Sequence, residues 1–287
     1  MRALVVSVDG VIGAALADGL AARGWAVRAT SRRGVPGAAA LDLAALPDPP
    51  LPPSPWGAPS METVFLCAAM SRQAACRADP AGAARVNRDA PTQLAQAAAA
   101  VGGRAVFLSS SAVFDGARPL RPADDPPCPL NDYGRLKAAA EAGVLHTPGG
   151  AVVRLTKVLH PAAPLFCGWR DALIGGGRIQ AFSDLRLAPV ALDQVVEALI
   201  LVATSGQAGV FQISGAMDIS YADAARHLAR RLGLPADRVE AVSAAQAGVP
   251  ACDRPTHTSM DASRLAALGY VPPDPFAVLD RVFSLAD

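Results

Sequence analysis

The sequence carries almost no net charge and very little lysine. Its 287 residues include 26 Lys and Arg against 25 Asp and Glu, which gives a formal net charge of +1. Neutralising the phosphates of a nucleic acid or of an anionic membrane needs a basic excess, so we expect neither kind of partner. Two of the basic residues are lysines, Lys137 and Lys157.

Cysteines in paired patterns and long apolar runs are also missing. The five cysteines are an odd number, without a CxxC pair or a matching histidine spacing, so we expect neither a disulfide framework nor a metal site. No stretch reaches the ~18 uninterrupted apolar residues of a membrane span. Met1 runs directly into an apolar segment without a cleavable signal. These absences favour a soluble, cytoplasmic protein.

Short apolar strands alternate with helical stretches through the first half of the chain. A strand at Ala3–Val8 precedes helical spacing over Gly10–Arg23 and a second strand at Trp25–Thr30. Further strands are predicted at 63–67, 105–108 and 151–155, with Ala-rich helices at 81–100 and 133–144. Such alternation favours a parallel sheet with both faces covered. We therefore predict an α/β fold with a Rossmann-type doubly wound parallel sheet.

The alternation loosens later in the chain and predicts a smaller α/β substrate-binding lobe. We assign residues 1–155 to the dinucleotide-binding domain, with 185–210 packing back onto it, and residues 156–184 and 211–287 to the smaller lobe. Pro47–Pro59 is rich in proline and is interpreted as a surface loop. Pro161–Arg178 contains prolines and three consecutive glycines and is interpreted as a mobile loop.

The turn after the first strand reads Ser7-Val-Asp-Gly10-Val-Ile-Gly13. A glycine-rich turn lets the backbone approach a pyrophosphate, and the N-terminus of the following helix favours its negative charge. Ser7 stands where a GxxGxxG spacing has its first glycine, but the position of this partial motif still predicts dinucleotide binding. The candidate cofactor-binding residues in this turn are Ser7, Gly10, Val11, Ile12 and Gly13. Asp9 does not suit an anionic ligand and is expected to point away.

The second strand ends in Thr30-Ser31-Arg32-Arg33. An acidic residue at this place would bond the ribose hydroxyls of NAD, whereas a basic residue accommodates the additional phosphate of NADP. Ser31, Arg32 and Arg33 offer a hydroxyl and two guanidiniums to that phosphate, so we predict that NADP(H) is favoured over NAD(H). The alternative is a solvated basic turn.

Tyr133 and Lys137 form a YxxxK motif and share one face of a predicted helix. A nearby ammonium lowers the pKa of a tyrosine, as a proton-transferring acid needs. With three tyrosines and two lysines in the chain, this spacing has a small chance of arising at random. Ser109, Ser110 and Ser111 follow a predicted strand, and ligands bind at the carboxyl ends of parallel strands. We expect these serines near the same reacting group.

Several motifs, in order along the chain, make it similar to a known family. They are Cys67-Ala-Ala69, Arg85-Val-Asn87, Ser109–Gly116, Pro129–Lys137, Val153-Arg-Leu155, Gly209–Ser214, Arg254-Pro-Thr-His-Thr258 and Asp261–Leu265. With them the chain resembles the extended short-chain dehydrogenase/reductases, and among these the dTDP-4-dehydrorhamnose reductases, nearly end to end. The YxxxK motif is diagnostic of the superfamily, and the Val113-Phe-Asp-Gly116 and Arg254–Thr258 motifs point to the reductase branch.

The resemblance implies roles for individual residues. Ser110 would polarise the substrate carbonyl, Tyr133 would donate the proton, and Lys137 would hold the nicotinamide ribose and tune Tyr133. The further implied cofactor contacts are Ala68, Ala69, Asn87 and, beside adenine, Asp42 and Leu43. The candidate substrate contacts are Ser111, Val113, Phe114, Arg178, Arg254 and His257. Trp169 and Arg178, on either side of the glycine run, could contact a sugar or nucleotide base, or could serve only in loop packing.

These features together predict an NAD(P)-dependent oxidoreductase that reduces a keto group on a nucleotide-activated deoxysugar and forms a homodimer. Two departures from the family leave alternatives open: Ser7 replaces a glycine, and Ser111-Ala112 stands where these reductases usually carry Asp-Tyr. One alternative is a nucleotide-sugar epimerase or dehydratase of the same superfamily. The other is a non-catalytic, NADP-binding regulatory subunit like that of methionine adenosyltransferase.

Overall fold

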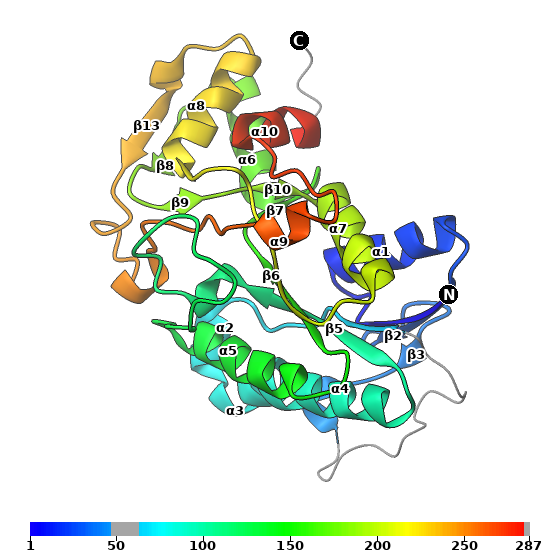
Figure 1. Cartoon of the computed structure of the whole chain (residues 1–287). Helices are drawn as coiled ribbons and strands as arrows, with labels where there is room; N and C mark the ends of the chain where they lie inside the picture. Colours follow the sequence, from blue (N-terminus) through cyan, green and yellow to red (C-terminus); the bar gives the residue numbers. More distant parts are fainter. Residues whose placement is uncertain (47–62, 284–287) are drawn as a thin grey trace.

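The computed structural model describes residues 1–46 and 63–283, so the predicted surface loop at Pro47–Pro59 lies outside the described residues. A seven-stranded parallel sheet forms the centre of the larger domain (Figure 1). Its strands lie in the order β11-β6-β5-β4-β1-β2-β3. Their bounds are β1 (Arg2–Val6), β2 (Ala26–Ser31), β3 (Ala39–Ala40), β4 (Thr63–Leu66), β5 (Arg104–Ser110), β6 (Ala151–Leu155) and β11 (Gly209–Ile213). The predicted Rossmann-type sheet is confirmed.

Helices cover both faces of this sheet (Figure 1). Helices α1 (Val11–Ala22) and α7 (Leu192–Ser205) pack on one face, and α4 (Ala90–Ala100) and α5 (Asp132–Leu145) pack on the other. Along β1, Ala3 and Val5 join the first apolar cluster, whereas Leu4 and Val6 join the second. Because both sides of the interior strands β4 and β6 are buried, these strands are rich in apolar residues, whereas β2 is only partly buried and β3 at the sheet edge is exposed.

The Ala-rich stretch predicted as one helix is interrupted. Helix α2 (Gln73–Ala78) is followed by α3 (Pro80–Ala84), a π-helical turn η2 (Arg85–Asp89) and α4. Short 3₁₀ turns connect other elements: η1 (Leu43–Ala45), η3 (Ser111–Val113), η4 (Ala236–Arg238) and η5 (Ala251–Asp253). A π-helical turn shifts the helix register by one residue and is often found at functional sites. This one carries Asn87, one of the predicted cofactor contacts.

The smaller lobe has its own apolar core. Its helices are α6 (Pro164–Ile174), α8 (Tyr221–Arg231) and α10 (Pro275–Phe283), and its strands are β7 (Val158–Leu159), β8 (Ile179–Phe182), β9 (Arg186–Leu187), β10 (Val190–Ala191), β12 (Ile219–Ser220) and β13 (Val239–Val242). The prediction of a mobile loop at Pro161–Arg178 is wrong, because most of it is α6. Phe166, Trp169 and Leu173 are spaced at helical intervals and bury one face of α6 in this core.

The larger domain also takes in part of the segment assigned to the smaller lobe. Strand β11 pairs with β6 along its whole length, so the sheet continues to Ile213. Helix α9 (Ser263–Ala266) lies near β11, and Leu265 and Tyr270 join the apolar cluster beneath α1 and α7. The chain therefore returns to the larger domain twice, first with β11 at the edge of the sheet and then with Leu265 and Tyr270 in the apolar cluster.

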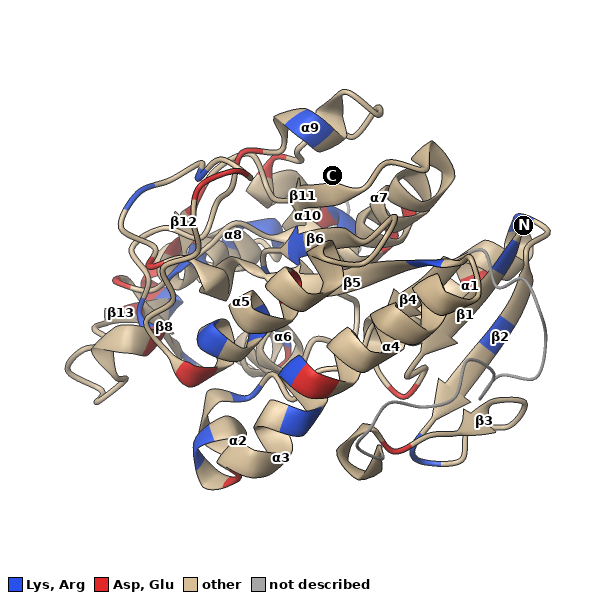
Figure 2. Ribbon diagram, turned by 60° about the horizontal axis from the view of Figure 1, so that its bottom comes forward, with Lys and Arg blue, Asp and Glu red and all other residues tan. Residues whose placement is uncertain are grey.

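Charged residues of both signs are interspersed over the two parts of the molecule (Figure 2). Within residues 1–46 and 63–283, no helix combines the length and the apolar character that crossing a bilayer requires.

Candidate active site

The end of β5 and the start of α5 meet at the carboxyl edge of the sheet. Ser110 is the last residue of β5, and Tyr133 is the second residue of α5. Gly134 makes the approach possible, since a Cβ at this position would collide with the carbonyl oxygen of Ala112. Asn131 caps the helix by accepting a hydrogen bond from the Gly134 amide at 2.9 Å. Ser110 and Tyr133 come together at this edge, near enough for the Ser110 side chain to act on the pKa of the Tyr133 phenol.

Lys137 lies one turn further along α5 and is 1% exposed. Its ammonium donates a hydrogen bond to the carbonyl oxygen of Leu108 at 2.8 Å. The same nitrogen lies 4.4 Å from the centre of the Phe107 ring and 5.9 Å from that of Tyr133. The structure therefore brings the three predicted catalytic residues together in a buried setting.

Burial shifts the protonation of both titratable groups. It raises the pKa of Tyr133 to about 12, and the hydrogen bond from Ser110 lowers that pKa only in part. It lowers the pKa of Lys137 to about 7, against the opposing effect of Glu141. The predicted net lowering of the Tyr133 pKa is thus not seen, because desolvation is the largest cause and Lys137 is not among the groups that shift this pKa. At neutral pH Tyr133 is a protonated phenol, able to donate a proton.

A buried ion pair lies behind the catalytic residues. Glu141, one turn beyond Lys137, pairs with Arg154 of β6 at 2.8 Å and accepts a hydrogen bond from the Ser109 hydroxyl. Both charged side chains are 3% exposed. This pair was not predicted from the sequence, because Glu141 and Arg154 come from different elements; the four-residue spacing of Lys137 and Glu141 indicates only that these two share a helix face. The pair fixes α5 to the sheet at the level of the catalytic lysine.

The turn between β1 and α1 has the shape that a pyrophosphate needs. A Cβ on Gly10 would meet no heavy atom within 4 Å, so its exposed backbone is open to a ligand. A Cβ on Gly13 would collide with the carbonyl oxygen of Ser7. Ser7 itself has a φ of 70°, in the left-handed region that favours glycine. Of the neighbouring candidates, Val11 is 46% exposed and Ile12 packs on the core.

At the end of β2, the contacts of Ser31 and the direction of Asp9 differ from those predicted. Ser31 is buried, and its hydroxyl donates to the Asp9 carboxylate at 2.7 Å. Asp9 was expected to point away; it points toward this strand end and also accepts from the amide of Arg32 at 2.8 Å. The Ser31 hydroxyl is therefore engaged within the protein. Arg32 and Arg33 are exposed, as a phosphate contact requires.

The other predicted cofactor residues are partly structural. Ala68 and Ala69 follow β4 at the same sheet edge. Asn87 is fully buried, and its amide group bonds the backbone of Met70 in both directions, at 2.9 and 3.0 Å. It holds the loop that carries the two alanines. Two further candidates lie at η1: Asp42 accepts from the Ala44 amide, and Leu43 packs in the core.

Two predicted substrate contacts are corrected. Val113 is fully buried and Phe114 is 6% exposed, and both pack with Met260. The Phe114 ring also lies against the guanidiniums of Arg121 and Arg154, 4.6 and 4.8 Å from its centre. These two side chains stabilise the loop after β5. Ser111 opens the turn η3 and remains partly exposed beside Ser110.

The segment around His257 lies against the loop after β5. The Thr256 hydroxyl and the His257 amide both donate to the carbonyl oxygen of Gly116, at 2.7 and 2.9 Å. Asp218, which was not predicted from the sequence, lies 3.4 Å from the His257 ring. Arg254 donates to the carbonyl oxygen of Val249. The remaining candidate, Arg178, donates to the carbonyl oxygen of Asp237 at 2.7 Å, within the smaller lobe.

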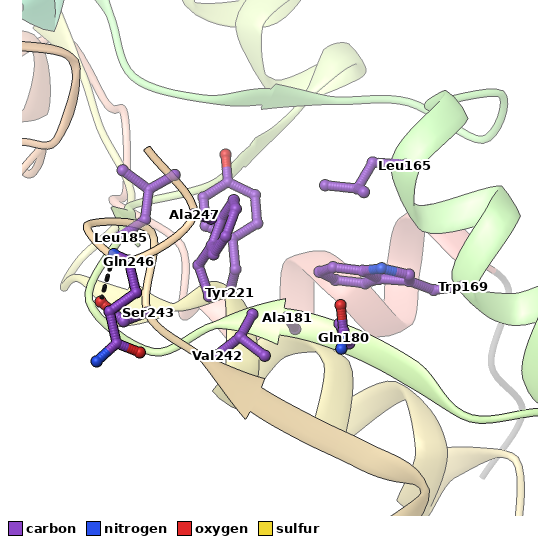
Figure 3. Close-up of a pocket in the computed structure, with 11 residues that line it drawn as sticks. Leu165, Trp169, Gln180, Ala181, Leu185, Tyr221, Val242, Ser243, Gln246 and Ala247 are labelled. Carbon is purple, nitrogen blue, oxygen red and sulfur yellow. Dashed lines mark hydrogen bonds between the residues drawn. The ribbon is translucent and has the colours of Figure 1, made fainter. Parts of the chain in front are cut away.

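A pocket of about 690 Å³ opens in the smaller lobe (Figure 3). Leu165 and Trp169 reach it from α6, and Tyr221 comes from the start of α8. Trp169 also packs edge-on against Phe166 and Tyr221. Neither the catalytic residues nor the basic candidates Arg178 and Arg254 line this pocket. Its walls suit an uncharged, flat group.

A Ser–Tyr–Lys set at the carboxyl edge of a Rossmann-type sheet defines an NAD(P)-dependent oxidoreductase of the short-chain dehydrogenase/reductase superfamily. The model of the RmlD substrate binding domain family matches residues 1–281, and the chain belongs to this family. The predicted membership is confirmed, and with it a nucleotide cofactor and an NAD(P)H-dependent sugar reductase as the class of enzyme.

The chain is similar to reductases and to a subunit of another enzyme. The dTDP-4-dehydrorhamnose reductase of Mycobacterium tuberculosis is 31% identical over 221 residues, 74% of this chain and 72% of that protein. Methionine adenosyltransferase 2 subunit beta of Pongo abelii is 40% identical over 94 residues, 33% of this chain and 28% of that protein. The dTDP-4-dehydrorhamnose reductase of Bacillus anthracis, solved in complex with NADP, superposes with a TM-score of 0.82 at 18% identity, covering 100% of this chain and 99% of that one. At that identity the likeness shows the fold.

Proposed function

We propose that the chain reduces a keto group on a nucleotide-activated deoxysugar, in the manner of a dTDP-4-dehydrorhamnose reductase. The observation that carries the proposal is the meeting of Ser110, at the end of β5, with Tyr133, at the start of α5, and with Lys137 one helical turn away. The sequence similarity to the mycobacterial reductase supports the choice of substrate class.

The catalytic residues divide the work at the carbonyl oxygen. A bound dihydronicotinamide would supply the hydride for the carbonyl carbon. Ser110 holds the carbonyl oxygen through its hydroxyl, and Tyr133 donates its phenolic proton to that oxygen as negative charge develops. The oxygen becomes the product hydroxyl, and Tyr133 recovers its proton from water. The ammonium of Lys137 stabilises the transient tyrosinate.

The residues at the ends of β1 and β2 fit a dinucleotide. The open backbone at Gly10, before the N-terminus of α1, would hold the pyrophosphate. The exposed guanidiniums of Arg32 and Arg33 support a preference for NADP(H) over NAD(H).

The apolar pocket fits the nucleotide base of the substrate. Trp169 and Tyr221 offer aromatic faces, and Gln180 and Gln246 offer amides that can pair with the edge of a base (Figure 3). The diphosphate would bind outside it, since its lining contains no Lys or Arg.

We also propose a homodimer formed through α4 and α5. A shallow hollow of about 400 Å³ lies between these helices, lined by Gln96 and Ala99 on one side and by Gly143 and His146 on the other. Sedimentation that shows only monomer at micromolar concentrations would exclude this assembly.

Turnover distinguishes this function from its alternatives. Incubation with NADPH and a dTDP-4-keto-6-deoxysugar should oxidise one NADPH per sugar and raise the sugar mass by two hydrogens. An epimerase would leave the sugar mass unchanged, and a dehydratase would lower it by one water, both without net NADPH oxidation. Tight NADPH binding without any turnover would instead support a regulatory subunit. The similarity to methionine adenosyltransferase 2 subunit beta makes this the second candidate function.

A further inference from the structure

The turn after β1 lies directly beside the end of β2. The two strands pair in parallel, and the pairing continues past β1, because the Val8 amide donates to the carbonyl oxygen of Thr30 at 2.9 Å. The Ser7 amide donates to the hydroxyl of the same threonine at 3.1 Å. These bonds place Asp9, two residues after Ser7, next to Ser31, Arg32 and Arg33.

Asp9 takes up the polar groups of that strand end. Its carboxylate accepts from the Ser31 hydroxyl at 2.7 Å and from the amides of Arg32 and Arg33 at 2.8 and 3.2 Å. Despite some desolvation, these hydrogen bonds and the charge of Arg33 lower the pKa of Asp9. The carboxylate is therefore ionised at neutral pH, although β2 itself ends without an acidic residue.

This arrangement has opposite consequences for the two nicotinamide cofactors. A carboxylate at the end of β2 accepts hydrogen bonds from a ribose 2′-hydroxyl, as in NAD-binding sheets, but repels a 2′-phosphate. The Ser31 hydroxyl and the two amides already donate to Asp9, so a phosphate could gain donors here only from the guanidiniums of Arg32 and Arg33. The 2′-phosphate of NADP(H) would therefore be attracted by the two arginines and repelled by the Asp9 carboxylate.

We propose that Asp9 is the residue that limits the selectivity of this chain for NADP(H), by setting its carboxylate against the 2′-phosphate that Arg32 and Arg33 attract. The proposal rests on the proposed function, since it concerns the cofactor of that reaction. The turn after β1 would thus influence the selectivity between NADP(H) and NAD(H), although the residues at the end of β2, taken alone, predict NADP(H).

Direct titration of the cofactors tests the proposal without turnover. The dissociation constants of NADPH and NADH, measured by nicotinamide fluorescence, are compared for the wild type, Asp9→Asn and Asp18→Asn. Asp18 is exposed on α1, the helix that follows the turn of Asp9, and provides the matched control, because its change also removes one negative charge. Asp9→Asn should raise the preference for NADPH over NADH by about tenfold, while Asp18→Asn leaves it unchanged. Arg32→Ala/Arg33→Ala should lower it.

A second probe covers the case in which Asp9→Asn disturbs the turn. Displacement of NADH by adenosine 2′,5′-bisphosphate and by AMP compares phosphate and hydroxyl at the 2′ position, and Asp9→Ser should shift the balance toward the bisphosphate in the same sense. An unchanged preference in both Asp9 variants, or an equal shift in Asp18→Asn, would overturn the proposal. A wild type that binds neither NADPH nor NADH would contradict the proposed function instead.

Discussion

The catalytic residues and the predicted phosphate contacts lie at neighbouring strand ends of one sheet but in different surroundings. Tyr133 and Lys137 are buried, with partners supplied by Ser110 and Leu108. Arg32 and Arg33 are exposed beside an ionised Asp9. The geometry of the first group is fixed by packing, as proton transfer requires, whereas we propose that the second group acts on its ligand through a balance of charges. Substitutions at the catalytic end, around Ser110, Tyr133 and Lys137, should therefore change the rate of reduction. Substitutions at the nucleotide end, around Asp9, Arg32 and Arg33, should change the selectivity between NADPH and NADH.

The buried ion pair behind the catalytic residues should show the largest effect. Glu141→Gln leaves Arg154 without its anionic partner inside the protein, and we expect a loss of about 3–5 kcal/mol in the free energy of unfolding. The matched control is Glu197→Gln, which removes the same charge from an exposed pair with Arg23 and should cost less than about 1 kcal/mol. Urea denaturation measures both. Equal losses would mean that the buried pair has no special role.

Gly134 should be the most sensitive glycine at the catalytic end. In Gly134→Ala the new methyl group collides with the carbonyl oxygen of Ala112, so α5 must shift and carry Tyr133 with it. We expect a loss of about 100-fold in kcat/KM, with NADPH binding retained. Gly168→Ala on the exposed face of α6 meets nothing within 4 Å and is the control. A fully active Gly134→Ala protein would show that this close approach is unnecessary.

The buried lysine predicts a pH dependence. Burial lowers the pKa of Lys137 to about 7, so its ammonium is present below that pH and is lost above it. Tyr133 stays protonated throughout, because its pKa is raised to about 12. The kcat/KM for reduction should fall about tenfold per pH unit above pH 7. Lys137→Arg keeps the charge and should flatten the profile; a wild-type profile flat to pH 9 would contradict this account.

The smallest effect is expected at Ser7. Its φ of 70° strains a residue with a Cβ, so Ser7→Gly should gain up to about 1 kcal/mol in the free energy of unfolding. Ser7→Ala keeps the strain and should stay within about 0.5 kcal/mol of the wild type. Thermal unfolding of both variants tests this, and a destabilised Ser7→Gly would place another role on this side chain.

The arrangement of the candidate catalytic residues could be predicted from the sequence because their spacing is local. A helix sets Tyr133 and Lys137 on one face whatever surrounds it, and Ser110 follows from a single strand end. The protonation state of Tyr133 could not be predicted in this way, because it depends on how deeply α5 is buried.

The contacts at the nucleotide end could not be predicted to the same extent, because they join segments that are distant in the sequence. The β1–α1 turn reaches the end of β2 only after the sheet has formed, so the sequence alone did not connect Asp9 with Ser31. Helix α6 was missed for a different reason. Prolines before it and glycines after it concealed the helical spacing of its buried residues, Phe166, Trp169 and Leu173.

The most direct test of the central claim is a single turnover of Tyr133→Phe. Wild type and variant, each loaded with NADPH in excess of its dissociation constant, are mixed with a dTDP-4-keto-6-deoxysugar, and nicotinamide absorbance is followed. The account predicts unchanged NADPH affinity and a reduction rate at least 100-fold lower in the variant. A variant that reduces the sugar at the wild-type rate would contradict the assignment of Tyr133 as the proton donor.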